Sequence, residues 1–209
     1  MLFEPDQRVT RAYFPLGGVV SLVTPMLDGN IVEMATIGRE GVVGVPALLD
    51  GALPAGTRGV SQVEGEALSI PAEAFRREMA AGGRLAPLVH TFTQALFTLV
   101  GRNAACNRLH YIEQRCARWL LMTHDRVGSD QFRLTQEFLA QMLGVQRSTV
   151  TVAAGDLQRA GLIGYSRGKI HILDRPKLVR TACECYQIVS SSYERVLQLN
   201  GNNSLVYVE

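Results

Sequence analysis

Residues 134–157 carry the pattern of two short helices joined by a tight turn, and no other stretch of the chain constrains the fold as strongly. Thr135 can cap the first helix, and Gly144 stands where a left-handed backbone would end it. Apolar residues recur on the inward side of both helices: Phe138, Leu139, Met142 and Leu143 on the first, and Val150, Ala153 or Ala154, and Leu157 on the second. The segment therefore predicts a helix-turn-helix.

The second of these helices begins with polar side chains that can face a partner. In the major groove of DNA, side chains at the first turn of a helix reach base edges, while its unpaired N–H groups favour phosphates. Arg147 can donate two hydrogen bonds to guanine. Residues 161–173 then predict two short strands joined by a basic turn, a wing that can rest on the phosphate backbone. The predicted DNA contacts are Thr135, Gln136, Gln146, Arg147, Ser148, Thr149, Thr151, Arg167 and Lys169. A small helical domain that contacts proteins is the alternative interpretation.

Residues 13–70 read as strands. Residues 19–24 and 31–37 are rich in β-branched and apolar side chains, and the Asp28-Gly29 pair between them suits a tight hairpin. Residues 61–63 and 67–70 predict a further strand pair. Glycines and prolines recur from 38 to 71, which favours a jelly-roll-like β-roll over a parallel sheet with crossover helices. Together with the helices that follow, the fold class is α+β.

Helices are predicted at 71–79, from about Leu85 onward and at 112–126. The long helix carries two series of residues spaced seven apart on adjacent faces, the pattern of a seam between two helices. The residues predicted to dimerise through it are Leu85, Val89, Phe92, Leu96, Leu99 and Asn103. Burial of this face against the chain's own β-roll is the alternative. A last helix, starting at Pro176, fits packing either on the roll or on a partner subunit.

Composition limits the class of protein. Of 209 residues, 47% are hydrophobic and 19% charged, as in globular proteins, and no apolar run is long enough to span a membrane. We see no export signal, so we expect a cytoplasmic protein with reduced cysteines. Residues 1–84 contain 7 basic and 10 acidic side chains, whereas residues 130–180 contain 8 and 4. This asymmetry suggests that one part meets a polyanion, although solvated helix faces would look the same. No paired carboxylates, nucleophile–base signature or phosphate loop indicates an enzyme.

Nearly the whole chain resembles the Crp/Fnr family of bacterial transcription regulators. The matching residues are Gly38–Gly44, Thr135–Ala140, Gly144–Val150, Gly161–Ile163 and Gly168–Ile170. The resemblance implies an effector-sensing β-roll (1–84), a dimerisation helix (85–110), a winged helix-turn-helix (111–180) and a C-terminal helical extension (181–209). It implies a homodimer that binds double-stranded DNA, with RNA polymerase as a further candidate partner. The alternative is a regulatory subunit that does not bind DNA, whose roll binds a ligand and whose helices dock a partner protein.

Departures from the family decide which functional residues carry over. Members that bind cyclic AMP have a Gly-Glu pair where this chain has Gly44-Val45, an Arg-Ser pair near Thr57-Arg58, and a Thr-Ser pair near Val100-Gly101. A cyclic nucleotide is therefore not expected. The predicted effector pocket consists of Gly44, Val45, Thr57, Arg58 and Val100, and its ligand is a small molecule still to be identified. The alternative for Arg58 is a surface arginine that binds no ligand. In the recognition helix, Arg147 matches the family's guanine-reading arginine, but Ser148 and Val152 depart from it, so the operator should differ.

Cofactor sites are not predicted. Oxygen-sensing members hold an iron–sulfur cluster on N-terminal cysteines, and this chain has no cysteine before Cys106. Cys183 and Cys185 are expected to point apart on a helix, and two thiolates do not complete a metal site. The four histidines are scattered, without the spacing of metal ligands: His90, His110, His124 and His171.

Overall fold

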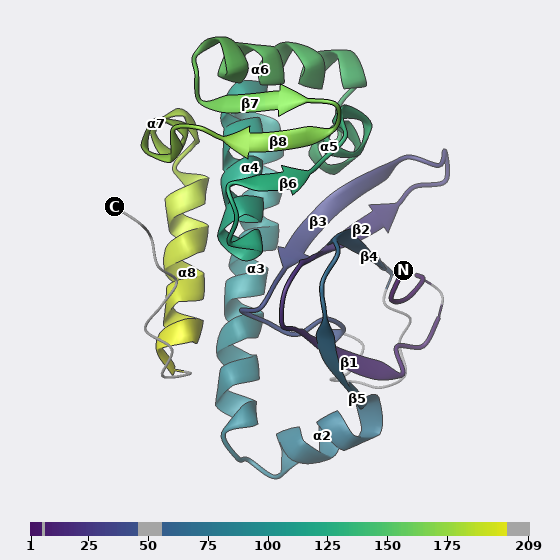
Figure 1. Ribbon diagram of the computed structural model, residues 1–209. Coiled ribbons are helices and arrows are strands. Elements are labelled where there is room, and N and C mark those ends of the chain that lie inside the picture. Colours follow the sequence, from purple (N-terminus) through teal and green to yellow (C-terminus); the bar gives the residue numbers. More distant parts are fainter. Residues whose placement is uncertain (6, 46–55, 200–209) are drawn as a thin grey trace.

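Among the described residues, the N-terminal part of the chain contains two small antiparallel sheets (Figure 1). The structure is a computed structural model that describes residues 1–5, 7–45 and 56–199. One sheet has the order β3-β2-β4, built from β2 (Val19–Pro25), β3 (Ile31–Ile37) and β4 (Arg58–Val63). The other pairs β1 (Arg11–Pro15) with β5 (Ala67–Pro71). The predicted hairpin joins β2 to β3, with Gly29 at a φ of 85°.

The predicted pairing of residues 61–63 with residues 67–70 is wrong. Both segments are strands, but β4 pairs with β2 in one sheet and β5 pairs with β1 in the other. Between them the chain passes directly over the β1–β2 connection, since a Cβ on Gly65 would lie 2.3 Å from the carbonyl oxygen of Gly17. The link therefore carries the chain from one sheet to the other and does not close a hairpin.

Three helices connect the roll to the C-terminal part: α2 (Ala72–Ala80), α3 (Leu85–Leu109) and α4 (Ile112–Val127). The residues predicted for the dimer seam are packed inside this chain. Val89, Phe92, Leu96, Leu99 and Asn103 are buried, and Leu85 is half-buried. Asn103 donates from Nδ2 to the Met34 carbonyl oxygen (2.8 Å) and accepts from Arg118 (2.6 Å). Within the chain, the C-terminal helix and the roll both cover this face of α3, so its apolar residues have partners without a second subunit.

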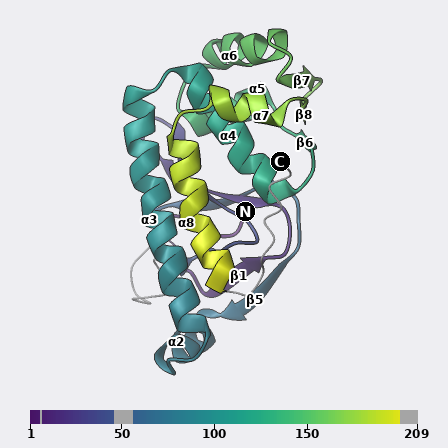
Figure 2. The same cartoon turned by 90° about the vertical axis from the view of Figure 1, so that its left-hand side faces the viewer.

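The C-terminal part contains a three-stranded sheet of order β6-β8-β7 and four helices among the described residues (Figure 1). Its elements are β6 (Gln131–Arg133), α5 (Gln136–Leu143), α6 (Arg147–Arg159), β7 (Ile163–Ser166), β8 (Lys169–Ile172), α7 (Arg175–Thr181) and α8 (Cys185–Leu199). The single helix predicted from Pro176 is two helices, because the chain leaves helical geometry at Ala182, where ψ is 156°. After this break α8 runs along α3 (Figure 2), with Val189, Tyr193 and Val196 buried.

Buried polar contacts tie α4 to the β-roll. Trp119 donates from Nε1 to the Glu33 carboxylate (2.7 Å), and Arg126 pairs with Glu40 at 2.8 Å. Both carboxylates and Arg126 are nearly inaccessible to water. Separation of α4 from the roll would leave the charges of Arg126 and Glu40 unpaired and would break the hydrogen bond between Trp119 and Glu33. Losing the partner of a buried charge or of a buried polar group is costly, so these contacts hold α4 on the roll. None of the described helices is long and apolar enough to cross a membrane.

Candidate nucleic-acid interface

The predicted helix-turn-helix is α5, a tight turn and α6. Thr135 caps α5, and its Oγ1 accepts a hydrogen bond from the Phe138 amide (3.1 Å). Gly144 ends α5 in the left-handed conformation (φ 62°, ψ 41°), which a glycine adopts without steric cost. Val145 is half-buried and donates to the Ala140 carbonyl oxygen (3.0 Å), which closes the turn. Thus the local signals read from the sequence produce the expected geometry.

The N-terminal end of α6 is open to solvent. Gln146, Arg147, Ser148 and Thr151 are exposed and Thr149 is half-buried, whereas Val150, Ala153, Ala154 and Leu157 are buried on the opposite side. Gln146 is the N-terminal cap residue, and its side chain makes no capping hydrogen bond to the first amides of the helix. Those amides, with the positive end of the helix dipole, favour an anion such as a phosphate.

The wing is a two-residue hairpin. Arg167 (φ 50°) and Gly168 (φ 72°) both have positive φ, as a type I′ turn between β7 and β8 requires. The Gly168 carbonyl oxygen accepts from the Leu134 amide (2.9 Å) and the Tyr165 hydroxyl donates to the Leu134 carbonyl oxygen (3.0 Å), so the hairpin is anchored beside the start of α5. Partial burial raises the pKa of Tyr165 to about 12, which keeps this hydroxyl protonated and able to donate.

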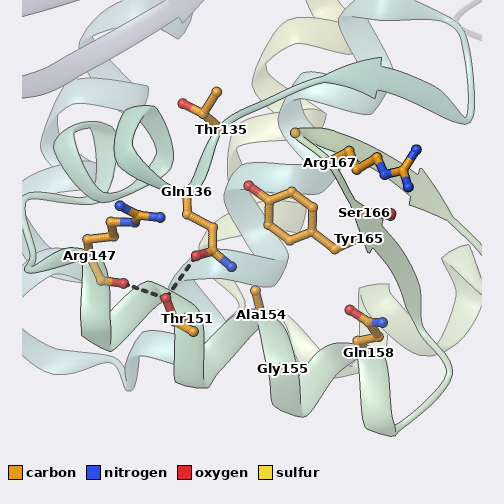
Figure 3. Close-up of a pocket in the computed structure, with 11 residues that line it drawn as sticks. Thr135, Gln136, Arg147, Thr151, Ala154, Gly155, Gln158, Tyr165, Ser166 and Arg167 are labelled. Atoms are coloured by element: carbon orange, nitrogen blue, oxygen red, sulfur yellow. Dashed lines mark hydrogen bonds between the residues drawn. The ribbon is translucent and has the colours of Figure 1, made fainter.

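A groove of about 570 Å³ lies between α6 and the wing (Figure 3). It brings together five of the predicted contacts: Thr135, Gln136, Arg147, Thr151 and Arg167. Thr151 donates to the Gln136 side chain (2.9 Å) and to the Arg147 carbonyl oxygen (3.0 Å), which fixes α5 against α6 at the groove's edge. Gln146, Ser148 and Lys169 are exposed but are not among the residues that line the groove.

Sequence reasoning missed the far end of this groove. Gln158, Tyr165 and Ser166 line it, together with Ala154, Gly155 and Gly168 (Figure 3). The signal was present in the spacing, because positions 147, 151, 154, 155 and 158 fall on one face of a helix. Tyr165 and Ser166 belong to the wing, and only the tertiary structure shows that this strand faces α6.

The positive charge of the groove comes from side chains at its two edges. Arg147 stands at the start of α6 and Arg167 at the tip of the wing (Figure 3). Lys169 is the first residue of β8, two positions after Arg167, and all three side chains are exposed. The nearby carboxylate of Asp156 is paired with Arg159 on the same helix. A surface with cations at two edges and hydrogen-bonding side chains between them is chemically suited to a polyanion that also carries base edges.

The predicted effector pocket is only partly described. Gly44 has a φ of 100° and Val45 is buried, but the chain then enters residues 46–55, which lie outside the described residues. Arg58 pairs with the Glu4 carboxylate at 2.8 Å, and Thr57 and Val100 are half-buried. A cavity of about 150 Å³ lies elsewhere, where Arg39–Val42 meets α3 and the end of α8.

The expectation that Cys183 and Cys185 point apart on a helix is wrong. Cys183 precedes α8 and lies in the break after α7, so helical geometry does not separate the two thiols. The structure places both beside Cys106 and His110 from the end of α3, and the four ligand atoms lie within 4.8 Å of one another. These residues could hold a metal ion.

Comparison with protein families assigns both halves of the chain. Residues 1–81 match the family described as the cyclic nucleotide-binding domain, and residues 114–181 match the Crp-like helix-turn-helix domain. The matched segments contain the β-roll and the α5–α6 pair with its wing. None of the curated proteins compared matches the chain.

Solved structures share the fold. A transcriptional regulator of the CRP family from Thermus thermophilus has a TM-score of 0.69 at 20% sequence identity, covering 84% of this chain and 89% of that one. A CRP/FNR-family regulator from the same organism scores 0.67 at 21% identity, covering 87% and 93%. FixK2 from Bradyrhizobium japonicum scores 0.73 at 16% identity, covering 87% and 91%. At these identities the likeness concerns the fold.

Proposed function

This chain belongs to the Crp/Fnr family of DNA-binding transcription regulators, and from that premise we propose that it reads its operator as a homodimer, with α6 in the major groove and the wing on the phosphate backbone. The single observation that carries this proposal is the solvent-open start of α6, where Arg147 stands at the edge of the groove shared with the wing. A helix that meets base edges must present its first turn without obstruction.

The roles of the individual contacts follow from their chemistry. Arg147 can donate a bidentate pair of hydrogen bonds to guanine, and Gln146 or Gln136 can serve adenine or a phosphate. Ser148, Thr149 and Thr151 bring hydroxyl groups, while Arg167, Lys169 and Thr135 lie where the backbone of the same duplex would run. Val152 is exposed beside them and can contact a thymine methyl group.

A second subunit would pack on the outward face of α3. The buried face is already occupied, whereas a stripe of exposed residues runs down the helix at spacings of four and three: His90, Gln94, Phe97, Gly101, Ala104 and Arg108. This is the spacing of a helix–helix seam. The Phe97 side chain is 80% exposed, and a Cβ on Gly101 would meet no described atom within 4 Å. Small residues beside an unburied aromatic ring favour close approach of a second α3.

The effector of the roll is proposed to be something other than a cyclic nucleotide. Arg58, the cation nearest in sequence to the expected phosphate site, is paired with the Glu4 carboxylate. Val45 supplies no carboxylate for a ribose and is buried. The contacts between α4 and the roll through Glu33 and Glu40 offer a physical route by which an effector could alter the position of α6. We place the protein in the cytoplasm with the DNA that it binds, assign it no catalytic role, and keep RNA polymerase as a further candidate partner.

The test is selection of bound DNA from a random pool, followed by affinity measurements on the selected site and its single-base variants. Arg147→Ala should cost about 1–3 kcal/mol of binding free energy and relax the preference at one base position. Arg84→Ala is the matched control, because it removes the same charge from an exposed position ahead of α3.

Two results would count against this proposal. Equal weakening of Arg147→Ala on every sequence would mean that the side chain only holds a phosphate. Absence of salt-dependent binding to any DNA would favour the alternative, a subunit that docks a partner protein, since contacts to phosphates make affinity depend on salt.

A further inference from the structure

The end of α3 lies near the start of α8 (Figure 2). Four side chains with metal-binding atoms, one pair from each of these two places, converge there. Cys106 and His110 are four residues apart at the end of α3. Cys183 lies two residues before α8, and Cys185 is the first residue of that helix. The three cysteines are at most 4% exposed and form a cluster of their own, apart from the main hydrophobic core. Neither the DNA-binding groove nor the predicted effector pocket includes any of them.

The spacing of the four ligand atoms suits one ion. Cys106 Sγ and Cys183 Sγ are 3.5 Å apart, Cys185 Sγ and His110 Nδ1 are 3.9 Å apart, and all four atoms lie within 4.8 Å of one another. In a tetrahedral zinc site with Zn–S bonds near 2.3 Å, neighbouring ligand atoms are about 3.8 Å apart. An ion can therefore enter with small shifts of the side chains.

The surroundings complete the arrangement. The other ring nitrogen of His110, Nε2, lies 3.2 Å from the Glu184 carboxylate, which is the contact that orients a metal-bound histidine. Such a contact directs Nδ1 toward the three sulfur atoms. Three thiolates and one neutral imidazole around a divalent ion carry a net negative charge, and the guanidinium groups of Arg118 and Arg115 interact electrostatically with Cys106. Positive charge is therefore available to balance the site.

We propose that Cys106, His110, Cys183 and Cys185 bind a single zinc ion. Four protein ligands fill the tetrahedral positions and leave none open for a substrate, so the role is structural and not catalytic. The ion would join residues that are 77 positions apart in the chain and fasten α8 to α3.

The position of the site suggests what its loss would change. His110 is the capping residue at the end of α3, next to the joint with α4. Arg115, at the start of α4, donates to Asn107 (2.8 Å) and to the carbonyl oxygen of Leu143 at the end of α5. Metal binding would therefore stabilise the joint that carries the helix-turn-helix, whether or not the protein binds the proposed operator.

Metal content and cobalt spectroscopy of the unaltered chain provide the first test. Protein purified under reducing conditions should contain about one zinc per chain. After removal of zinc, Co²⁺ alone should produce the visible absorption of a tetrahedral site with a thiolate charge-transfer band, at one equivalent. Zinc should then displace cobalt and raise the thermal midpoint of unfolding.

Variants locate the site. Cys185→Ala and His110→Ala should each weaken zinc affinity at least 100-fold, and Glu184→Gln should weaken it about 10-fold, in line with contacts that orient a ligand. Cys116→Ala is the matched control: Cys116 is buried in α4 and is the one cysteine of the chain outside the cluster. Its zinc affinity should stay unchanged.

Three outcomes would overturn the proposal. The reduced protein could bind less than about one tenth of an equivalent of zinc or cobalt. Cys116→Ala could reduce the affinity as much as Cys185→Ala does. Cys106 and Cys183 could form a disulfide whose reduction restores no metal binding, in which case their proximity serves redox chemistry instead.

Discussion

Replacing Glu33 by glutamine should remove a pH-dependent penalty from the folded state. Glu33 lies on β3, is almost completely buried, and accepts a hydrogen bond from Trp119 Nε1 (2.7 Å). Burial raises the pKa of its carboxyl from 4.5 to about 7, because the loss of hydration outweighs the hydrogen bond from Trp119 and the attraction of Arg118 and Arg126.

The sign and the size of the change in stability with pH follow from the difference between the pKa of Glu33 in the folded and the unfolded state. The folded state binds the proton more tightly than the unfolded state does, so the contribution of Glu33 to stability is fully present below about pH 4.5 and is lost as the pH rises through about 7. The difference in pKa corresponds to about 3 kcal/mol over the whole range, at about 1.4 kcal/mol for each tenfold change in proton affinity. Between about pH 5.5 and pH 8, about 2 kcal/mol of this is lost.

The glutamine of Glu33→Gln cannot ionise, so the variant should not lose this stability when the pH rises. The difference in free energy of unfolding, variant minus unaltered protein, should therefore increase by about 2 kcal/mol from about pH 5.5 to about pH 8. The amide N–H groups that the variant buries add a cost of their own, but this cost is the same at every pH. The assay is urea unfolding followed by the fluorescence of Trp119, the one tryptophan of the chain and the hydrogen-bond partner of Glu33.

Glu66→Gln is the control for this experiment, since it removes a carboxylate from an exposed position. Its pH profile should parallel that of the unaltered protein. If the stability difference between Glu33→Gln and the unaltered protein is the same at both pH values, the argument that burial keeps Glu33 protonated is refuted.

Two further predictions concern the helix cap and the proposed dimer. Thr135→Ala should lower the free energy of unfolding by about 1 kcal/mol, because α5 loses its side-chain cap. Thr135→Ser keeps a hydroxyl at this position, so it should retain most of the stability that the cap provides. Urea unfolding at neutral pH measures both variants, and an equal loss of stability in the two would contradict the capping role. Phe97→Glu should convert the dimer to monomers in sedimentation at micromolar concentration, because it places like charges at the seam, whereas Leu68→Glu, an exposed site on β5, should leave the dimer intact. An unchanged sedimentation coefficient for Phe97→Glu would exclude this face of α3 as the interface.

Much of the DNA-binding part could be predicted from the sequence because its signals are local. The cap at Thr135, the turn at Gly144 and the alternation of buried and exposed positions along α6 act within a few residues of one another, so the pattern and the geometry agree. The same holds for the Asp28-Gly29 hairpin. The groove's distal residues were missed because Tyr165 and Ser166 reach it through the pairing of β7 with β8.

The long helix shows where sequence reasoning fails. Apolar residues with a seven-residue period predict only that one face of the helix is buried. Which segment packs on that face depends on residues far away in the chain. Here the roll and α8 cover Val89, Phe92 and Leu99, so the face that remains for a partner is the one marked by Phe97.

By itself the sequence determined the helix-turn-helix, its wing and the class of the roll, since periodicity, caps and turns depend on neighbouring residues. Only the tertiary structure decided which strands pair, which face of α3 is free, and that Cys106 and His110 lie beside Cys183 and Cys185. The physical reason is that these contacts join segments separated by tens of residues. Whether two distant segments meet depends on the packing of the whole chain, and no local sequence pattern encodes that packing.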